Sequence, residues 1–223
     1  GAQLGNSQLL DSLVHDGLWD AFNDYHMGVT AENLAREYGI SRELQDAWAL
    51  SSQHKARRAI DSGRFRDEIV PVIGELNGAR CLVDTDEQPR VDPSAEALAS
   101  LLPTFDQQGS VTAGNASQMS DGAGAVMLVS EKVLKEHNLT PLARFAGFAV
   151  GGVAPEIMGV GPIVAIPKVL QQAGIRKEDL DWIELNEAFA AQSLAVMNTL
   201  GLDPAKANPN GGAIALGHPL GAT

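Results

Sequence analysis

The second half of this 223-residue chain alternates apolar segments of strand length with segments of helical periodicity. In chain order these are 125–129 (strand), 131–137 (helix), 145–150 (apolar), 162–173 (helix) and 182–185 (strand). Ser130 can cap the first helix and Asn138 can end it, while Gly174 closes the second. The run 125–129 is suited to a buried strand. Strands that alternate with helices of this length predict an α/β architecture.

The first half carries one long amphipathic pattern between Ser41 and Asp61. Apolar residues recur there at helical spacing, behind a serine that can cap the helix and ahead of Gly63: Leu44, Trp48, Ala56, Ala59 and Ile60. We expect one long helix, followed by a strand at 68–73. Residues 81–103 are rich in Asp, Glu and Pro, which predicts surface loops and short helices, including one at 96–102.

The composition restricts the class of protein. The hydrophobic content of 44% is enough for a packed core, and no apolar run approaches the roughly 20 residues that cross a bilayer. We therefore expect no membrane association. Because Cys81 is the only cysteine, we expect a cytoplasmic protein without disulfides. The formal charge of −12 argues against a broad surface for nucleic acid.

Two polar residues near the C-terminal end are the main catalytic candidates. Asn186 follows the predicted strand 182–185 and precedes a helical pattern at 188–200, at the edge where open α/β sheets bind ligands. His218 lies in the glycine-rich run 211–219, and histidine can exchange a proton near neutral pH. An amide and an imidazole on such turns can stabilise an oxyanion. The alternatives are structural: Asn186 as a helix N-cap, Glu187 as a first-turn acid, and His218 as an ordinary turn residue.

Other candidate sites are weaker. His26 precedes a helix signal, whereas the other three histidines have polar neighbours. The basic residues between Lys55 and Arg90 are interpreted as a solvated helix face, with a site for an anionic ligand as the alternative. The sequence has no clustered Cys/His pattern, so we expect no metal. It has neither a P-loop nor a GxGxxG motif for phosphate binding.

A series of motifs extends over nearly the whole chain. In order they are Tyr25-His26-Met27-Gly28, Asp67-Glu68-Ile69-Val70-Pro71, Val111-Thr112-Ala113-Gly114-Asn115-Ala116-Ser117, Met158-Gly159-Val160-Gly161-Pro162, Asn186-Glu187-Ala188-Phe189-Ala190-Ala191-Gln192 and the run 211–219. In this order they resemble the thiolase family, which comprises the acetyl-CoA acetyltransferases and the 3-ketoacyl-CoA thiolases. The resemblance implies part of a layered, thiolase-like α/β fold and an acyltransferase of fatty acid metabolism.

The implied reaction is the reversible thiolytic cleavage or Claisen condensation of a 3-ketoacyl-CoA, with acetyl-CoA and CoA as partners. Residues 25–28 resemble the short-chain acetoacetyl-CoA enzymes, whereas 116–118 and 155–159 also resemble the broader 3-ketoacyl enzymes. We favour short chains. Coenzyme A is a substrate here, so the resemblance implies no cofactor.

The resemblance also implies roles for individual residues. His218 would activate a nucleophilic cysteine and donate to the thioester oxyanion, and Asn186 would hold a water that completes the oxyanion hole. The other residues would line the CoA site: His26 and Ser117 beside the thioester; Met27, Met158, Ala188 and Phe189 on the apolar wall; and Leu101, Phe105, Ala113 and Arg90 along the CoA, with Arg90 nearest the nucleotide.

By the same resemblance the chain divides into a CoA-binding loop domain (1–119), a strand and helix that return to the N-terminal half (120–139) and part of a C-terminal domain (140–223). Neither of the family's two catalytic cysteines is present, and Cys81 matches neither context. We therefore expect the chain alone to be inactive. The alternative is a non-catalytic CoA-binding or interaction module. The family also implies a dimer or tetramer of the intact enzyme.

Overall fold

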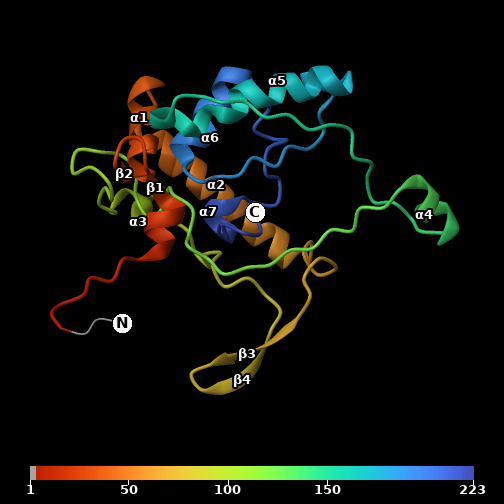
Figure 1. The fold of residues 1–223 in the computed structure, drawn as a ribbon, viewed down its shortest axis with the longest axis horizontal. Coiled ribbons are helices and arrows are strands. Elements are labelled where there is room, and N and C mark those ends of the chain that lie inside the picture. Colours follow the sequence, from red (N-terminus) through yellow and green to blue (C-terminus); the bar gives the residue numbers. More distant parts are fainter. Residues whose placement is uncertain (1–3) are drawn as a thin grey trace.

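The structure, a computed structural model, describes residues 4–223. Helices α1, α2, α3, α6 and α7 gather in one body around the long α2, whereas α4 and the β3–β4 hairpin project from it (Figure 1). The elements are a π-helix Leu13–Leu18, β1 Trp19–Asp20, β2 Tyr25–His26, α1 Gly28–Glu37, α2 Arg42–Asp61, β3 Val72–Leu76, β4 Ala79–Val83, α3 Ala95–Ala99, α4 Glu131–Glu136, a 3-10 helix Pro155–Val160, α5 Gly161–Ala173, a 3-10 turn Lys177–Asp179, α6 Ala190–Leu200 and α7 Ala213–Leu216.

Helix α2 confirms the predicted long helix. The Ser41 hydroxyl accepts a hydrogen bond from the Leu44 backbone N–H, which satisfies one of the free donors at the start of the helix. On the inner face of α2, Ala49 packs against Ala190 and Ile214. The small Ala49 and Ala190 side chains allow α6 to approach α2 closely, and Ile214 fills the space between α2 and α7.

Helix α6 is buried on most of its surface. Ala190, Ala195 and Val196 are each fully buried, and Gly201 closes the helix in a left-handed conformation with φ 57°. A helix with this much buried apolar surface belongs inside a protein. Its N-cap is Phe189, so the interpretation of Asn186 as an N-cap is wrong. Asn186 stands three residues before the cap and its side chain is free for another role.

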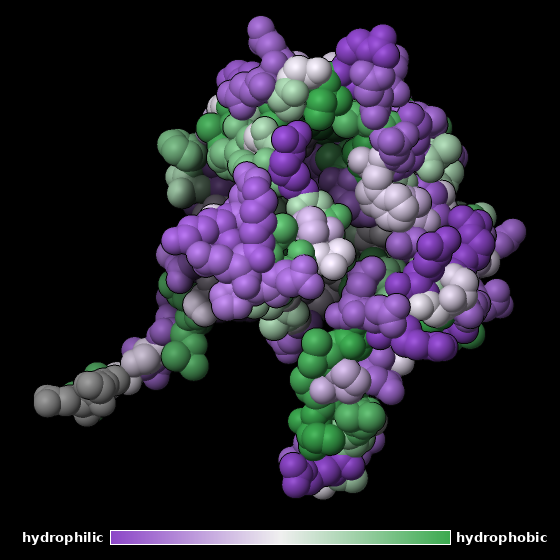
Figure 2. Space-filling view, turned by 90° about the vertical axis from the view of Figure 1, so that its right-hand side faces the viewer, coloured by the Kyte–Doolittle hydropathy of each residue, from purple (hydrophilic) through white to green (hydrophobic). Residues whose placement is uncertain are grey.

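The β3–β4 hairpin projects from the body as a separate finger, and Figure 2 shows hydrophobic side chains along it. Asn77 and Gly78 form its two-residue turn, with φ of 52° and 79°, as a type I′ turn requires. The strand predicted at 68–73 is therefore displaced, because the ladder begins at Val72, paired with Val83. Pro71, immediately before it, has no backbone N–H to extend the ladder.

The remaining helix predictions are confirmed, with shifts of a few residues. Helix α4 begins after Ser130, whose hydroxyl accepts from the Val133 N–H, and it ends before Asn138 at φ 50°. Helix α5 ends at Gly174, which is left-handed at φ 67°. The helix predicted at 96–102 is shorter and is α3. Local capping chemistry thus determines where these helices start and stop.

The predicted buried strand at 125–129 is wrong. Residues 123–130 have no regular structure, and the Val126 side chain is 88% exposed. The apolar segment 145–150 likewise lies mostly at the surface. The strand predicted at 182–185 is reduced to one parallel bridge between Ile183 and Ala207. An apolar run becomes a strand only when another strand hydrogen-bonds to it, and within residues 4–223 none lies beside 125–129.

Candidate active site

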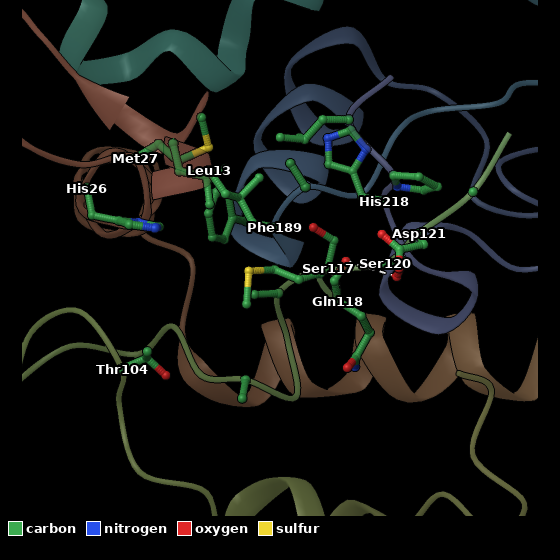
Figure 3. A pocket seen from close by; sticks show the side chains of 18 of the residues that line it. Leu13, His26, Met27, Thr104, Ser117, Gln118, Ser120, Asp121, Phe189 and His218 are labelled. Atoms are coloured by element: carbon green, nitrogen blue, oxygen red, sulfur yellow. Dashed lines mark hydrogen bonds between the residues drawn. The ribbon is translucent and has the colours of Figure 1, made fainter. Parts of the chain in front are cut away.

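A cavity of about 740 Å³ opens beside the central body, and Figure 3 shows His26 and His218 on opposite sides of it. Its walls come from strand β2, from loops near residues 105 and 112–122, from the start of α6 and from the segment after α7. Eight residues singled out from the sequence line it: His26, Met27, Phe105, Ala113, Ser117, Ala188, Phe189 and His218. Segments far apart in the sequence therefore meet around one space.

Aromatic rings form one wall of this cavity. The His26 and Phe105 rings stack with centroids 4.8 Å apart, and Phe105 meets Phe189 edge to face at 6.1 Å. Gly28, at the start of α1, lies directly against the Phe105 ring, and a Cβ at this position would collide with it. The glycine of the Tyr25-His26-Met27-Gly28 motif therefore lets Phe105 reach His26.

A short backbone pairing joins the loop 115–117 to the start of α6. The Ser117 N–H donates to the Ala188 carbonyl at 2.9 Å, and the Ala190 N–H donates to the Asn115 carbonyl at 2.9 Å. Between these bonds, Ala116 and Phe189 form an antiparallel bridge. The pairing places Ser117 and Phe189 beside each other on the cavity wall, although more than 70 residues separate them in the chain.

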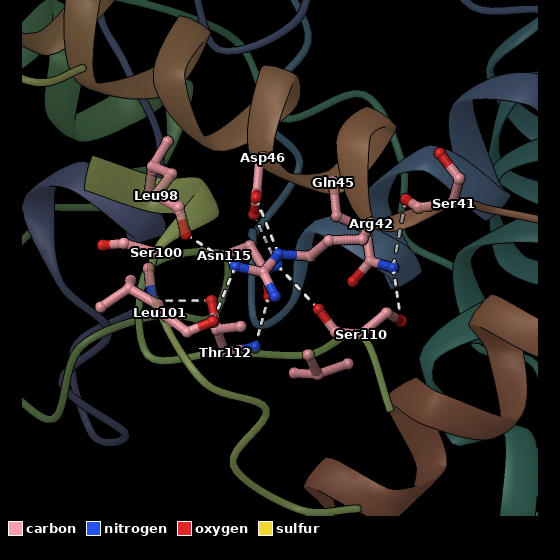
Figure 4. A network of polar contacts seen from close by, with 12 residues as sticks. Ser41, Arg42, Gln45, Asp46, Leu98, Ser100, Leu101, Ser110, Thr112 and Asn115 are labelled. Atoms are coloured by element: carbon pink, nitrogen blue, oxygen red, sulfur yellow. Dashed lines mark hydrogen bonds and ion pairs between the residues drawn. The ribbon is translucent and has the colours of Figure 1, made fainter. Parts of the chain in front are cut away.

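A buried polar network holds this loop to α2 (Figure 4). The Asn115 side-chain Nδ2 donates to the Asp46 carboxylate at 2.9 Å, and its side-chain Oδ1 accepts from the Thr112 N–H at 2.8 Å. Asp46 also pairs with Arg42, one turn earlier on α2, at 2.7 Å. Arg42 in turn donates to the carbonyl oxygens of Leu98 and Leu101. Arg42, Asp46 and Asn115 each have hydrogen-bond partners, which holds the loop in one arrangement.

Asn186 and His218 approach each other where the large cavity, lined by His218, adjoins a smaller one, lined by Asn186. The distance between Asn186 Nδ2 and His218 Nε2 is 3.4 Å, although 32 residues separate them in the chain. The His218 backbone N–H donates to the Gln118 carbonyl at 3.2 Å, which fixes the turn that carries the ring. When the imidazole carries its proton on Nε2, both nitrogens can donate to one oxygen that lies within reach of each. Such an arrangement can stabilise a developing oxyanion.

Burial controls the charge of both imidazoles at the cavity. It lowers the pKa of His218 and the pKa of His26 below the usual histidine value, because an apolar surrounding disfavours the charged ring. The His218 Nδ1 atom is buried and has no hydrogen-bond partner among residues 4–223. Asp121 is the only carboxylate among the residues that line the cavity. The lowered pKa favours the neutral ring, which can accept one proton and donate another.

A smaller cavity of about 220 Å³ adjoins the first and shares Met27, Ala188 and Phe189 with it. Asn186 and Met158 line this smaller space rather than the larger one. The loop that carries Met158 fits closely, since a Cβ on Gly159 would lie 2.9 Å from the Leu34 side chain. Met27, Ala188 and Phe189 thus form the boundary between the two cavities.

Two of the predicted residues line neither cavity. The Leu101 side chain packs over Gly114, where an added Cβ would lie 2.5 Å from it, so Leu101 supports the loop from behind. Arg90 is exposed, and its backbone N–H donates to the Gln53 side chain at 2.9 Å. The structure therefore does not bring Arg90 to the space that the other candidates share.

Glu187 has a larger role than the first-turn acid that its position suggests. It is 1% exposed and its carboxylate accepts four hydrogen bonds. No local pattern reveals this role, because its partners lie 21 to 139 residues away in the chain. Ser120 and Gln118 were also not selected, although both line the large cavity.

The described part of the chain contains no group of three or more His, Cys, Asp or Glu side chains placed to hold a metal ion. Cys81 lies in β4 on the projecting hairpin, paired in register with Gly74, and does not line either cavity. None of the helices within residues 4–223 is long and apolar enough to cross a membrane.

Comparison with known proteins connects this site to one family. Residues 1–132 match the family "Thiolase, N-terminal domain", and residues 139–223 match "Thiolase, C-terminal domain". The chain is 65% identical over 223 residues to a probable acetyl-CoA acetyltransferase of Escherichia coli K12, covering 100% of this chain and 57% of that protein. It therefore spans little more than half the length of the curated relatives that it matches.

Solved structures show the same similarity. The acetyl-CoA acetyltransferase of Bacillus anthracis matches with a TM-score of 0.95 and 47% identity, covering 100% of this chain and 56% of that one. Human mitochondrial 3-ketoacyl-CoA thiolase in complex with CoA matches with a TM-score of 0.92 and 48% identity, covering 100% and 55%. These matches confirm the predicted thiolase-like α/β fold. The chain belongs to the thiolase family.

Proposed function

We propose that these residues form the CoA cradle and the oxyanion-binding part of a thiolase active site. The observation that carries the proposal is the approach of Asn186 Nδ2 to His218 Nε2, 3.4 Å apart, beside the 740 Å³ cavity. An apolar, aromatic wall suits the pantetheine arm of CoA, and two convergent polar groups suit the thioester oxygen. Burial lowers the pKa of the His218 ring, so it is suited to accept a thiol proton.

The reaction proposed for the enzyme is the reversible thiolytic cleavage of a 3-ketoacyl-CoA. Cleavage breaks the bond between C2 and C3 and gives acetyl-CoA and a shortened acyl-CoA, whose new thioester sulfur comes from CoA. The acyl group passes through a cysteine thioester. In this scheme His218 takes the cysteine proton and donates to the thioester oxyanion, while Asn186 orients a water that completes the oxyanion hole.

Acetoacetyl-CoA is the proposed substrate, supported by the names of the Escherichia coli and Bacillus anthracis relatives. The cavity residues would take the roles that the resemblance implies, with His26 and Ser117 beside the thioester. The thiol itself is not supplied by Cys81, which lies on the hairpin away from the cavity. We therefore expect the 223-residue chain to bind CoA without cleaving acetoacetyl-CoA.

Calorimetry with CoA on the 223-residue chain tests this proposal. The variant Gly28→Ala places a methyl group against the Phe105 ring and disturbs its stack on His26, so we expect at least about tenfold weaker binding, or about 1.4 kcal/mol. Cys81→Ser, on the hairpin, is the matched control and leaves the affinity unchanged. The absence of CoA binding by the parent chain would refute the proposed CoA cradle.

An acetoacetyl-CoA cleavage assay distinguishes the enzyme fragment from the other candidate, a non-catalytic CoA-binding or interaction module. Cleavage by the 223-residue chain at an ordinary enzyme rate would contradict our expectation of inactivity. Stable, tight CoA binding by a chain that never supports cleavage, even when the rest of a thiolase is added, would favour the module.

We further propose that the intact enzyme is a cytoplasmic homodimer or homotetramer that uses CoA as a substrate and no metal or prosthetic group. The family membership supports the assembly, and the presence of one cysteine in these 223 residues is consistent with the compartment. Light scattering of the intact enzyme after size exclusion, with and without a chelator, tests the assembly and the metal independence together.

A further inference from the structure

Glu187 is a buried carboxylate that four donors surround. Oε1 accepts from Trp48 Nε1 at 3.0 Å and from Asn208 Nδ2 at 3.0 Å. Oε2 accepts from Ser52 Oγ at 2.7 Å and from the Ile214 backbone N–H at 3.2 Å. Because a carboxylate has two oxygens and only accepts when ionised, its bonding capacity matches this set of donors.

The donors come from three separate parts of the fold. Trp48 and Ser52 lie one turn apart on α2, Asn208 precedes the glycine pair 211–212, and Ile214 lies in α7. Ser52 links a further group, because its hydroxyl also accepts from the Gly212 N–H at 3.0 Å. The carboxylate therefore joins the long central helix to residues on both sides of the glycine pair 211–212.

The glycine-rich segment rests on this carboxylate without space to spare. A Cβ on Gly212 would lie 2.5 Å from Glu187 Oε2, and a Cβ on Gly211 would lie 2.6 Å from the Ala56 side chain. Gly211 also needs its positive φ of 87°. Ile214 is four residues before His218, so a bond that holds Ile214 also restrains the imidazole.

We propose that Glu187 is a positioning residue, whose carboxylate sets the approach of Asn186 to His218 by fastening both of their segments to α2. Asn186 is its immediate neighbour in the chain, and His218 follows the segment held through Gly212 and Ile214. We call Glu187 and its four donors the clamp. The catalytic meaning of the clamp rests on the proposed function, whereas its hydrogen bonds do not.

Several charged groups near Glu187 and near the large cavity can influence the pKa of His218. Lys55 on α2 and Glu184 interact electrostatically with Glu187. Burial lowers the pKa of Lys55, and the charge of Glu187 partly opposes that effect. At the cavity, His26 and Asp121 are the other titratable residues that line the space around His218.

The decisive variant is Glu187→Gln, tested by NMR titration of the histidine side chains in the 223-residue chain. In either orientation the amide NH₂ faces two donors, so the clamp loses at least the bonds of one oxygen. We expect the His218 ring to become more solvated and its pKa to rise toward the usual value of about 6.5. His26, on β2, is the internal control and keeps its titration curve.

Two further variants keep the test falsifiable. Glu184→Gln removes one acid three residues earlier, on an exposed side chain, and leaves His218 unchanged. Ser52→Ala retains the carboxylate but removes one donor and the link to Gly212, so it shifts His218 in the same direction and less. If Glu187→Gln does not fold, Ser52→Ala decides the question.

The proposal is overturned if His218 titrates as in the parent chain in the variant or variants that fold. It is also overturned if His26 shifts equally, because that result means a general loosening rather than a local clamp. Calorimetry with CoA keeps this result separate from the proposed function. A chain that binds no CoA but shows the selective His218 shift disproves the cradle and retains the clamp.

Discussion

Two regions of this molecule have similar apolar content but opposite environments. In the central body, formed by α1, α2, α6 and α7, small apolar side chains are fully buried, and the buried Asp46 and Ser52 side chains on α2 are hydrogen-bonded. In the outer segment, residues 123–150, an apolar run and the short helix α4 lie at the surface. Val196 of the body is 0% exposed, whereas Val126 of the outer segment is 88% exposed.

The difference shows what apolar residues need in order to form a core. Helix α6 satisfies its own backbone hydrogen bonds, so it needs neighbours only for its side chains. A strand at 125–129 would need a second strand for its backbone as well, and none lies beside it in the part of the chain that the structure describes. The same difference should appear in the free energy of unfolding when matched residues of the two regions are replaced.

The largest expected difference in the free energy of unfolding is between two ion pairs with the same spacing in the sequence. Asp46→Ala breaks the buried network that includes Arg42 and Asn115, and we expect it to lower the free energy of unfolding by about 3 kcal/mol. Glu131→Ala breaks the exposed pair with Lys135 on α4, which should cost about 0.5 kcal/mol or less. Urea denaturation measures both, and equal losses would show that the network does not stabilise the body.

A second comparison uses one substitution in two places. Val196→Ala removes two buried methyl groups from the cluster around Leu185 and Leu202, and we expect a loss of about 2 kcal/mol. Val126→Ala changes an exposed side chain and should stay within about 0.5 kcal/mol. A substantial loss at Val126 in the same urea experiment would mean that the outer segment is covered in solution.

The smallest expected effect concerns pH and the cavity of the central body. Burial lowers the pKa of His26 and of His218 in the folded state, so below about pH 6.5 the unfolded chain binds protons that the folded chain does not. Stability should therefore fall as the pH decreases from 7 through this window. The double variant His26→Gln with His218→Gln should flatten the slope of thermal stability against pH. If the slope is unchanged, the pH dependence of stability comes from titratable groups other than these two histidines.

Helix ends were predictable from the sequence because their chemistry is local. Ser41 and Ser130 each cap a helix from a position directly before it, and Gly174 ends α5 in the left-handed conformation that the residue tolerates. The cavity residues His26 and Ser117 came instead from motif order, since nothing local to either residue specifies a shared space.

The roles of Asn186 and Glu187 illustrate what local reasoning misses. Position alone favoured Asn186 as an N-cap, but the buried Phe189 begins the helix because the loop 115–117 pairs with residues 188–190. Glu187 has the position of a first-turn acid, yet donors from α2 and α7 surround it. In both cases a contact made by distant residues overrides the local preference.

The sequence by itself determined the helix ends at Ser41, Ser130 and Gly174, the family, and the choice of Asn186 and His218 as candidate catalytic residues. Only the tertiary structure decided which apolar runs are buried, and it placed the amide 3.4 Å from the imidazole through segments that α2 holds together. The physical reason is that a cap depends on hydrogen bonds within one turn, whereas strands, cavities and buried carboxylates depend on partners supplied from elsewhere in the chain.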